Sequence, residues 1–586
     1  MSSAPTARSL LVGHLPLIVY ALDQLGIIDV LRRRFPKHDL AHVSNADCIA
    51  VLILNILSGR CALYRIERFL QPIDLELLIG DHAKPNHFND TRLARALDAL
   101  DQDGVDDIFA EIVTTYLRRP DQPDAFALHI DSTSLALYGI FDGQHQPTPA
   151  YGFSKDKRPD LKQLVFGLGV RGGDAVPLAY TLRDGNTSDH AVNRALLAAV
   201  QQRVKQDCDV TVVADCKAAE PITIGKIRQA NFHVITLLPD TFALRRTLIE
   251  AAWEAEPDLA DWPILAEKPG RRKADPKLYY RGWSIESAFT VQREEDGKVV
   301  VESEPFRFLV VASDTLSKNL EKTLPKKLKS ERAKLLKGLK TLNRSGFACS
   351  ADAQAAGEKL TKNVRLHDVK VGTYFEDIPE KRSVRGRPAK GSKSLTKRVW
   401  KTSLEVSESA EKLLRARRRG SCFVLLSDHL DELTWPDARV LSTYRHQTLV
   451  ENHTGFRWLK SEAGVSPLFL KTSSRIRALG LVFVLALMVR NFLQHRLESR
   501  LAARGELIRH PFTKQEVPRL TTEMMFNHFD FIRTTLIQIG EGPEQRSDIN
   551  LPPEAIHILQ ILEISTDRFR HPPRSHPVIK KRASPS

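Results

Sequence analysis

The sequence lacks the cysteine patterns that organise many small folds. Its cysteines include no Cys-x-x-Cys pair and none of the spacings typical of zinc ligands. This argues against a disulfide framework and against a structural zinc site, and we expect reduced thiols. The six are Cys48, Cys61, Cys208, Cys216, Cys349 and Cys422.

Long hydrophobic runs are also scarce. The longest uninterrupted one, Ala478 to Val489, has 12 residues, too few to cross a bilayer, and we expect it to be a core helix packed on a sheet. The N-terminal segment lacks the basic stretch, clean apolar core and small-residue cleavage site of a signal peptide. These absences predict a cytoplasmic protein with no membrane partner.

Composition and charge narrow the class of protein. Of 586 residues, 42% are hydrophobic and 27% are charged, as in soluble globular chains, and the length suggests several domains. The net charge of +15 favours a polyanionic partner, either nucleic acid or an anionic membrane surface. Because membrane signals are lacking, a cytosolic nucleic-acid protein is the leading class.

Helical periodicity dominates residues 1–120, which we predict to be an α-helical N-terminal domain. Glycines and polar caps punctuate the pattern, and Asn45 and Asp90 are the predicted N-caps of two helices. Two short helices around Gly26 form either a DNA-binding helix-turn-helix or part of a compact bundle. The sequence does not choose between these two.

From residue 126 the periodicity becomes that of β-strands, and we predict an α/β core over residues 121–239. Three strands form a meander with a hairpin turn at residues 171–174, followed by a helix, a strand, a helix and a strand. Alternation in the first strand places Asp131 on one face with His129 and Thr133. Asp215 ends the fourth strand, which we expect beside the first, so the two aspartates should meet.

The chemistry of these two acids requires a compensating charge. Neighbouring carboxylates raise each other's pKa, and oxygen ligands without histidine or cysteine suit Mg²⁺ or Mn²⁺. A third acid lies on a late helix, where Tyr444, Gln447 and Glu451 are spaced i, i+3, i+7 and share one face. We expect that face to bring Glu451 to the metal site and to turn Tyr444 and Gln447 towards substrate phosphates.

Between residues 240 and 435, strand-like pieces sit among strongly basic stretches, and we predict a β-rich, basic insertion domain. Residues 381–401 carry nine Lys or Arg and no acid, which indicates a partly flexible cationic module. Within it, Arg385 and Arg387 flank a glycine in VRGRPAKG, which resembles an AT-hook. These arginines either recognise a narrow minor groove or give only general affinity for the DNA backbone.

The remainder of the chain is predicted to be mainly helical. Helices of the α/β core return at residues 436–500. Residues 501–586 are predicted to form a C-terminal helical region that ends in a basic, Pro-rich, disordered tail.

Together these motifs resemble the DDE transposases of bacterial insertion sequences, in particular the IS-four superfamily with its Y-R-E-K helix signature. The chain is similar to the group that carries a GFSKDKRPDLKQL-type segment after the first acid, here residues 152–164, followed by PLAYTLRDGNTSDH. The resemblance extends from the N-terminal helices to about Arg500. It implies an RNase H-like core, interrupted by the insertion before the third acid, with a catalytic triad of Asp131, Asp215 and Glu451.

The chain departs from the family pattern at two positions. Gln447 replaces the arginine that follows the tyrosine by three residues, and Trp458 stands where a lysine is expected, seven residues after the glutamate. The nearest lysine is Lys460. On an uninterrupted helix it would point about half a turn away from Glu451, unless a bulge or kink at Gly455 restores its direction.

The expected activity is metal-dependent phosphoryl transfer on double-stranded DNA. Asp131 would bridge two Mg²⁺ or Mn²⁺ ions, and Asp215 and Glu451 would each complete one. Water attacks first and releases a 3′-OH at the element end, and this 3′-OH then attacks target DNA. The basic segment after the first acid is either a solvated turn or a set of contacts to DNA phosphates. Its cations are Lys155, Lys157, Arg158 and Lys162.

The resemblance also implies partners. These are the element ends and the target DNA, and the pairing of two ends implies a homodimer in the bacterial cytoplasm, associated with the nucleoid. Two other interpretations stay open. One is a metal-dependent nuclease or resolvase on the same fold, which would cut DNA without joining it. The other is a catalytically inactive DNA-binding protein derived from a transposase, which the presence of all three acids disfavours.

Overall fold

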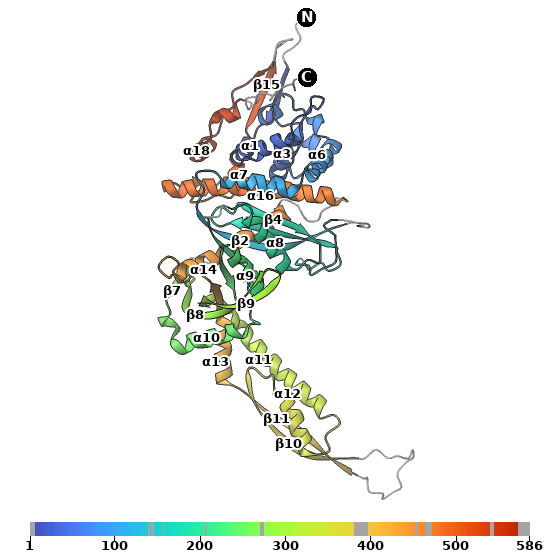
Figure 1. The fold of residues 1–586 in the computed structure, drawn as a ribbon, viewed down its shortest axis with the longest axis vertical. Helices are drawn as coiled ribbons and strands as arrows, with labels where there is room; N and C mark the ends of the chain where they lie inside the picture. Colours follow the sequence, from blue (N-terminus) through green and yellow to red (C-terminus); the bar gives the residue numbers. More distant parts are fainter. Residues whose placement is uncertain are drawn as a thin grey trace, which may run out of the picture. The chain divides into compact units, whose positions relative to one another are not determined.

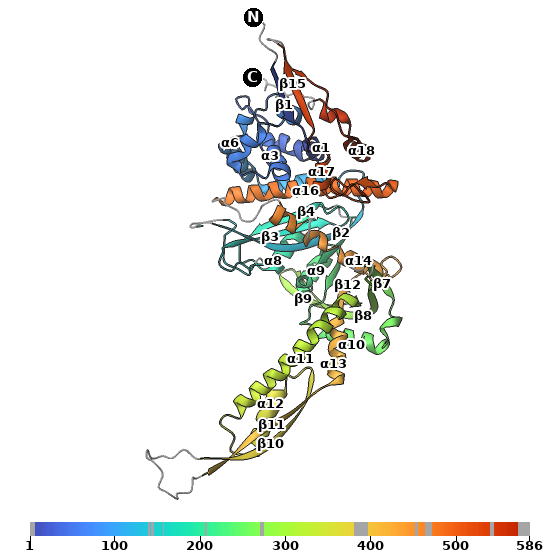
Figure 2. The same ribbon diagram turned by 180° about the vertical axis from the view of Figure 1, so that it is seen from behind.

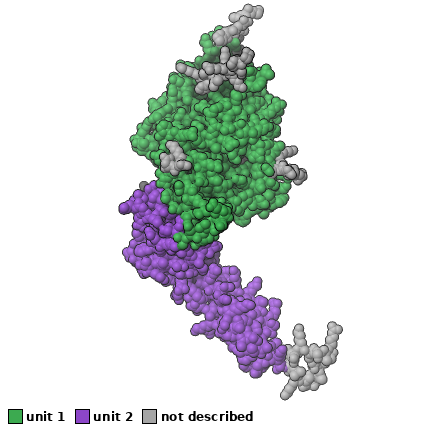
Figure 3. Space-filling model, in the orientation of Figure 1, with its two compact units in different colours: residues 1–236, 290–303, 442–586 green, residues 237–289, 304–441 purple. Residues whose placement is uncertain are grey.

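The protein is a mixed α/β chain (Figure 1). The computed structural model describes residues 6–138, 141, 146–155, 157–204, 208–269, 275–379, 396–451, 455–462, 472–539 and 544–571. The chain divides into two compact units, each built from separate segments (Figure 3). Unit 1 comprises Met1–Thr236, Thr290–Ser303 and Ser442–Ser586, and unit 2 comprises Leu237–Phe289 and Glu304–Leu441. None of the six cysteines, all of which lie in the described ranges, forms a disulfide.

The first part of unit 1 is helical. Its longer helices are α1 (Leu15–Gln24), α2 (Ile27–Arg34), α3 (Asn45–Leu54), α6 (Asp90–Gln102) and α7 (Val105–Leu117). Ser44 caps α3 in a capping box, and Asn89 caps α6. The predicted caps, Asn45 and Asp90, are wrong by one residue, because in both helices the preceding polar side chain accepts the hydrogen bond from the first turn.

A small sheet in unit 1 joins segments from opposite ends of the chain. Strand β1 (Thr6–Leu11) pairs antiparallel with β15 (Arg533–Gln538), which also pairs with β16 (Gln545–Arg546). The C-terminal region therefore contains strands beside its helices α17 (Thr522–Asn527) and α18 (Pro553–Leu562). The C-terminal helical region that we predicted thus also contains strands, which the sequence did not indicate because strands this short show little periodicity.

Five strands of unit 1 form the sheet that carries the candidate site. In spatial order they are β4 (Pro177–Arg183), β3 (Gln163–Arg171), β2 (Ala125–Ala136), β5 (Asp209–Ala214) and β6 (His233–Leu237). The pairs β2–β3 and β3–β4 are antiparallel, whereas β2–β5 and β5–β6 are parallel. Helix α8 (Asp189–Gln201) lies between β4 and β5 in the chain, and α9 (Pro221–Gln229) connects the parallel strands β5 and β6. The expectation that the fourth strand lies beside the first is confirmed.

The longest helix of unit 1, α16 (Ser473–Arg504), contains the apolar run noted in the sequence. It packs on β4 and on several N-terminal helices, among them α3 and α6. Figures 1 and 2 show it between those helices and the sheet. It is long and apolar enough to cross a membrane, but 83% of its most apolar 18-residue window is buried in the protein. Burial of this kind is typical of a core helix.

Unit 2 contains a sheet and a helix-covered hairpin. The sheet has the order β12 (Cys422–Ser427), β9 (Lys298–Ser313), β8 (Leu278–Glu295) and β7 (Ile264–Lys268). The end of β8 and the start of β9 lie within Thr290–Ser303 and so belong to unit 1. The hairpin pairs β10 (His367–Pro379) with β11 (Thr396–Glu408). The helices of this unit are α10 (Ala243–Ala255), α11 (Asp314–Leu342), α12 (Ser350–Thr361) and α13 (Ala410–Ser421). The predicted β-rich insertion thus contains six strands together with these four helices in the part that the structure describes.

Candidate functional site

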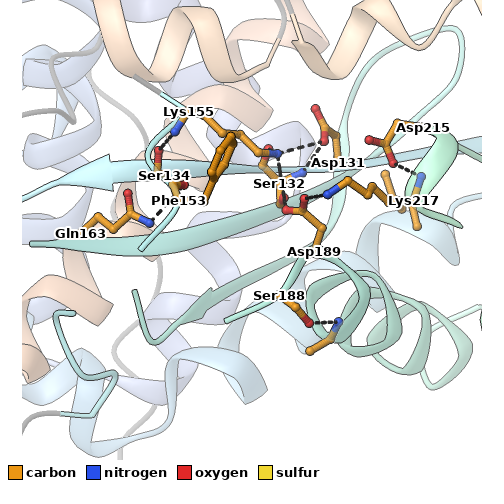
Figure 4. Close-up of polar contacts among 12 residues, drawn as sticks. Asp131, Ser132, Ser134, Phe153, Lys155, Gln163, Ser188, Asp189, Asp215 and Lys217 are labelled. Carbon is orange, nitrogen blue, oxygen red and sulfur yellow. Dashed lines mark hydrogen bonds and ion pairs between the residues drawn. The ribbon is translucent and has the colours of Figure 1, made fainter. Parts of the chain in front are cut away.

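Asp131 and Asp215 lie on adjacent strands of the unit 1 sheet. The parallel register of β2 and β5 pairs Ile130 with Ala214, so the two acids directly follow a pair of neighbouring residues. The Asp131 side chain is 18% exposed, and its Oδ1 accepts a hydrogen bond from the Ser132 N–H at 2.7 Å. Asp215 caps the short turn after β5 by accepting from the Lys217 N–H at 3.0 Å. The backbone thus holds both carboxylates at one place on the sheet (Figure 4).

Glu451 ends the short helix α15 (Thr448–Glu451), and its charge acts on Asp131. Burial raises the pKa of Asp131 to about 6; the nearby Asp215 and Glu451 add to this rise, and Lys155 opposes it. Burial also raises the pKa of Asp215, and burial together with the charge of Asp215 raises the pKa of Glu451. The three carboxylates therefore form one electrostatic cluster in which the anionic forms are disfavoured. Such an all-oxygen donor set is chemically suited to a hard divalent cation.

Lys155 supplies a positive charge beside this cluster. Its Nζ donates hydrogen bonds to the Ser132 carbonyl at 2.5 Å and to Ser132 Oγ at 3.0 Å, and it lies 3.7 Å from Asp131 Oδ1. The sequence placed Lys155 among possible contacts to DNA phosphates. In the structure its ammonium group offsets part of the repulsion among the carboxylates (Figure 4).

A fourth acid, Asp189, stands beside Lys155 and was not singled out in the sequence. It lies in the first turn of α8 and accepts from Ser132 Oγ at 2.6 Å and from Lys217 Nζ at 3.0 Å; Lys155 Nζ is 3.5 Å away. Burial alone would raise the pKa of Asp189, but these hydrogen bonds and charges bring it below its ordinary value. In the sequence this residue looks like a helix N-terminal acid, because its long-range partners become visible only after folding.

The helix expected to carry Tyr444, Gln447 and Glu451 on one face is broken. Helix α14 (Asp437–Arg445) ends two residues before α15 begins, and the Gln447 N–H donates to the Tyr444 carbonyl at 2.9 Å in a tight turn. The expectation of one continuous helix is therefore wrong. Burial raises the pKa of Tyr444, and the charges of Asp215 and Glu451 raise it further, so the tyrosine still lies near the carboxylates.

Gln447 faces the interior of the protein. Its side chain is buried: Nε2 donates to the Ile130 carbonyl at 2.8 Å, and Oε1 lies 3.2 Å from His129 Nδ1. The contact with a substrate phosphate that the sequence suggested is not available in this conformation, since both polar atoms of the amide are engaged with β2. The structure therefore gives Gln447 a positioning contact that links the α14–α15 turn to the Asp131 strand.

Lys460 lies near the same face of β2. It belongs to the π-helical turn Trp458–Glu462 and lines a small apolar cavity together with Thr133 and Leu135. Thr133 shares a strand face with Asp131, as alternation requires. Trp458, at the position of the expected lysine, is instead buried, with the Arg490 guanidinium 5.4 Å from its ring centroid. Lys460 is thus placed close to the site despite its offset in the sequence.

The other cations of the basic segment make local contacts. Lys157 is exposed and has a φ of +58°. Arg158 donates two hydrogen bonds to Asp160, and Lys162 Nζ donates to the Phe141 carbonyl at 3.1 Å. The predicted AT-hook residues, Arg385 and Arg387, lie outside the described residues.

Comparison with known proteins identifies the N-terminal part of the chain only. Residues 7–114 match a family described as a domain of unknown function (DUF4277). This segment contains the N-terminal helices and ends before β2, so it includes none of the clustered carboxylates. No curated protein gives a significant match to the chain. The segment that matches DUF4277 therefore precedes the sheet that holds the carboxylate cluster.

Proposed function

We propose that the protein is a DDE-type transposase of a bacterial insertion sequence, which binds the element ends and catalyses Mg²⁺-dependent DNA cleavage and strand transfer. The observation that carries this proposal is the cluster of Asp131, Asp215 and Glu451 on adjacent elements of unit 1. The succession of a three-stranded meander, helix, strand, helix and strand supports the RNase H-like core implied by the resemblance. The DUF4277 domain, which occurs in transposase-like proteins, adds support.

The three carboxylates would hold two Mg²⁺ or Mn²⁺ ions. When bound, the ions supply activation of the attacking hydroxyl and stabilisation of the departing oxygen. The protein contributes the geometry: the Ser132 N–H fixes the rotamer of Asp131, and the turn after β5 fixes Asp215. Gln447 holds the start of α15, which carries Glu451, against β2.

Double-stranded DNA is the proposed substrate, in the cytoplasm of a bacterium and bound to its nucleoid. The net charge of +15 supports a polyanionic partner. On the loop that carries Lys155, the exposed Lys157 and Arg158 are available to approach a phosphate of the cleaved strand. Pairing of two element ends would require two copies of the chain, so the active form is proposed to be a homodimer.

The test follows nicking and joining on a plasmid that carries the DNA flanking this reading frame. Asp131→Asn and Glu451→Gln should retain DNA binding and lose Mg²⁺-dependent cleavage. Asp209→Asn, at the opposite end of β5 from Asp215, is the matched control and should cleave normally. Mg²⁺-dependent cleavage by the Asp131→Asn variant would overturn the proposal. Cleavage without any joined product would favour the nuclease instead.

A further inference from the structure

Helix α11 of unit 2 carries a cationic face that no step of the proposed chemistry uses. At 100° per residue, seven exposed cations fall within an arc of about 140° on this 29-residue helix. We call this set the α11 stripe. It consists of Lys318, Lys322, Lys326, Lys329, Arg332, Lys337 and Lys340.

The opposite face of α11 is packed inside unit 2. Leu324 and Leu335 are buried, and the helix contacts α12, α13 and β11. Figures 1 and 2 show α11 and α12 beside the β10–β11 hairpin. Because this apolar face is already covered, α11 cannot insert it into a lipid surface, as a membrane-bound amphipathic helix must.

The two acids in the middle of α11 are also directed away from the stripe. Glu331 accepts hydrogen bonds from the Arg365 and Leu366 N–H groups at 2.9 and 3.0 Å, and it contacts His367 Nδ1 at 2.8 Å. Glu321 accepts from Arg417 at 2.9 Å. The helix therefore uses these carboxylates for internal contacts and leaves its cations on the outside.

Within the described part of the chain, the seven side chains of the α11 stripe form no ion pair or hydrogen bond. Several of them are like-charged neighbours at i, i+4, such as Lys318, Lys322 and Lys326, which destabilises a helix by a few tenths of a kcal/mol per pair. An arrangement that concentrates this repulsion on one face, without a local acid, is suited to a polyanionic ligand.

The length of the stripe indicates the kind of polyanion. From Lys318 to Lys340 the helix rises about 33 Å, close to one turn of B-form DNA, about 34 Å. Pro325 interrupts the hydrogen-bond ladder after the second cation, so the five that follow it form the longest straight part. We propose that the α11 stripe binds the phosphate backbone of double-stranded DNA without sequence preference. This inference rests on the proposed function, since it supplies that activity with a second DNA-binding surface.

The experiment compares two charge-matched pairs in the full-length protein. Lys329→Gln/Lys340→Gln removes two charges from the α11 stripe, and Lys327→Gln/Lys334→Gln removes two exposed charges from another side of the same helix. Glutamine is a good helix former, and equal melting temperatures would verify that both pairs fold. Binding to a 60-base-pair duplex of arbitrary sequence is measured between 50 and 200 mM salt, in EDTA so that no cleavage occurs.

The stripe pair should make the negative slope of log binding constant against log salt shallower by about 1.8. Between 50 and 200 mM salt, this variant should therefore lose about 12-fold less affinity than the unmodified protein loses. The control pair should keep the slope of the unmodified protein. Equal slopes for the two pairs would overturn this inference and leave the proposed function standing. The inference would also be overturned if the stripe pair weakened binding to phosphatidylserine vesicles or to duplex RNA more than it weakened binding to duplex DNA. If the unmodified protein binds no DNA at any salt, both proposals fail.

Discussion

Gln447 joins the turn between α14 and α15 to the strand that carries Asp131. Its Nε2 donates to the Ile130 carbonyl at 2.8 Å, which fixes the amide so that Oε1 faces His129 Nδ1 at 3.2 Å. Burial lowers the pKa of His129 to about 4, so the imidazole is neutral at pH 7. Since Oε1 can only accept, the proton of this neutral imidazole is on Nδ1.

Replacement of this amide tests whether Gln447 is a positioning residue. Gln447→Met keeps the approximate volume but leaves the His129 Nδ1–H and the Ile130 carbonyl without this partner. We expect the free energy of unfolding to fall by at least about 2 kcal/mol, because each buried unpaired group costs about 1–3 kcal/mol. Urea unfolding measures this loss, and cleavage should fall in parallel as Glu451 loses its support. If the variant instead unfolds normally and binds DNA more weakly, Gln447 contacts phosphate.

Asp131 should destabilise the metal-free protein. Its pKa rises from 3.8 to about 6 on folding, mainly through burial. Above pH 6 the ionised carboxylate therefore lowers the free energy of unfolding, and this loss of stability disappears below pH 3.8. Asp131→Asn should therefore raise the free energy of unfolding by about 1–3 kcal/mol at pH 7.5 in EDTA. Thermal melts check this, and added Mg²⁺ should stabilise the unmodified protein more than the variant.

Asp189→Asn is the control, because it should change the stability of the protein in the opposite direction to Asp131→Asn. The pKa of Asp189 is lowered in the fold, because hydrogen bonds from Ser132 and Lys217 outweigh burial, so its carboxylate adds stability above the unfolded pKa. That variant should melt at a lower temperature at pH 7.5, and the difference should shrink as the pH falls. A lower melting temperature for Asp131→Asn in EDTA would contradict the assignment of Asp131 as a strained carboxylate.

Lys155 should set the pH at which the site becomes able to bind metal. Its charge lowers the pKa of Asp131, so Lys155→Met should raise that pKa above its present value of about 6. Only the ionised carboxylate binds a cation, so Mn²⁺ affinity rises as Asp131 loses its proton. In Lys155→Met the midpoint of this rise should lie at a higher pH. Titration calorimetry from pH 5 to 8 measures it. Lys157→Met, on the same loop, removes a charge that does not contribute to the Asp131 shift and should leave the midpoint unchanged.

Part of this site could be predicted because it depends on local pattern and on a simple topological rule. Alternation placed Asp131 on a face of its strand, and a strand that follows a meander and a helix commonly lies beside the first strand. These two arguments were enough to bring Asp131 next to Asp215.

The remaining contacts depend on partners far away in the chain. The break between α14 and α15 coincides with the burial of Gln447 against Ile130, more than 300 residues earlier, and no periodicity within the helix shows it. Asp189 likewise acquires its role from Ser132 and Lys217. Helix α11 was not predicted as a separate element, because its interior Pro325 is a residue that normally ends or kinks a helix.

Arg171 and Asp174 form a buried ion pair in the turn between β3 and β4, and Tyr116 of α7 completes it. Arg171 donates from both Nε and Nη2 to Asp174, whereas the Tyr116 hydroxyl donates to Asp174 at 2.9 Å and accepts from Arg171 at 2.7 Å. Both members of the ion pair are almost inaccessible to solvent. This network attaches a helix of the N-terminal segment to the sheet.

Removal of one charge should therefore cost more than removal of the hydroxyl. Arg171→Met leaves Asp174 buried without its cation and should lower the free energy of unfolding by about 3–5 kcal/mol. Tyr116→Phe keeps the ion pair and should cost about 1–2 kcal/mol. The double variant Arg171→Met/Asp174→Asn should recover part of the first loss, since no uncompensated charge remains. Urea unfolding of the three variants measures these differences, and an Arg171→Met loss no larger than that of Tyr116→Phe would contradict the argument.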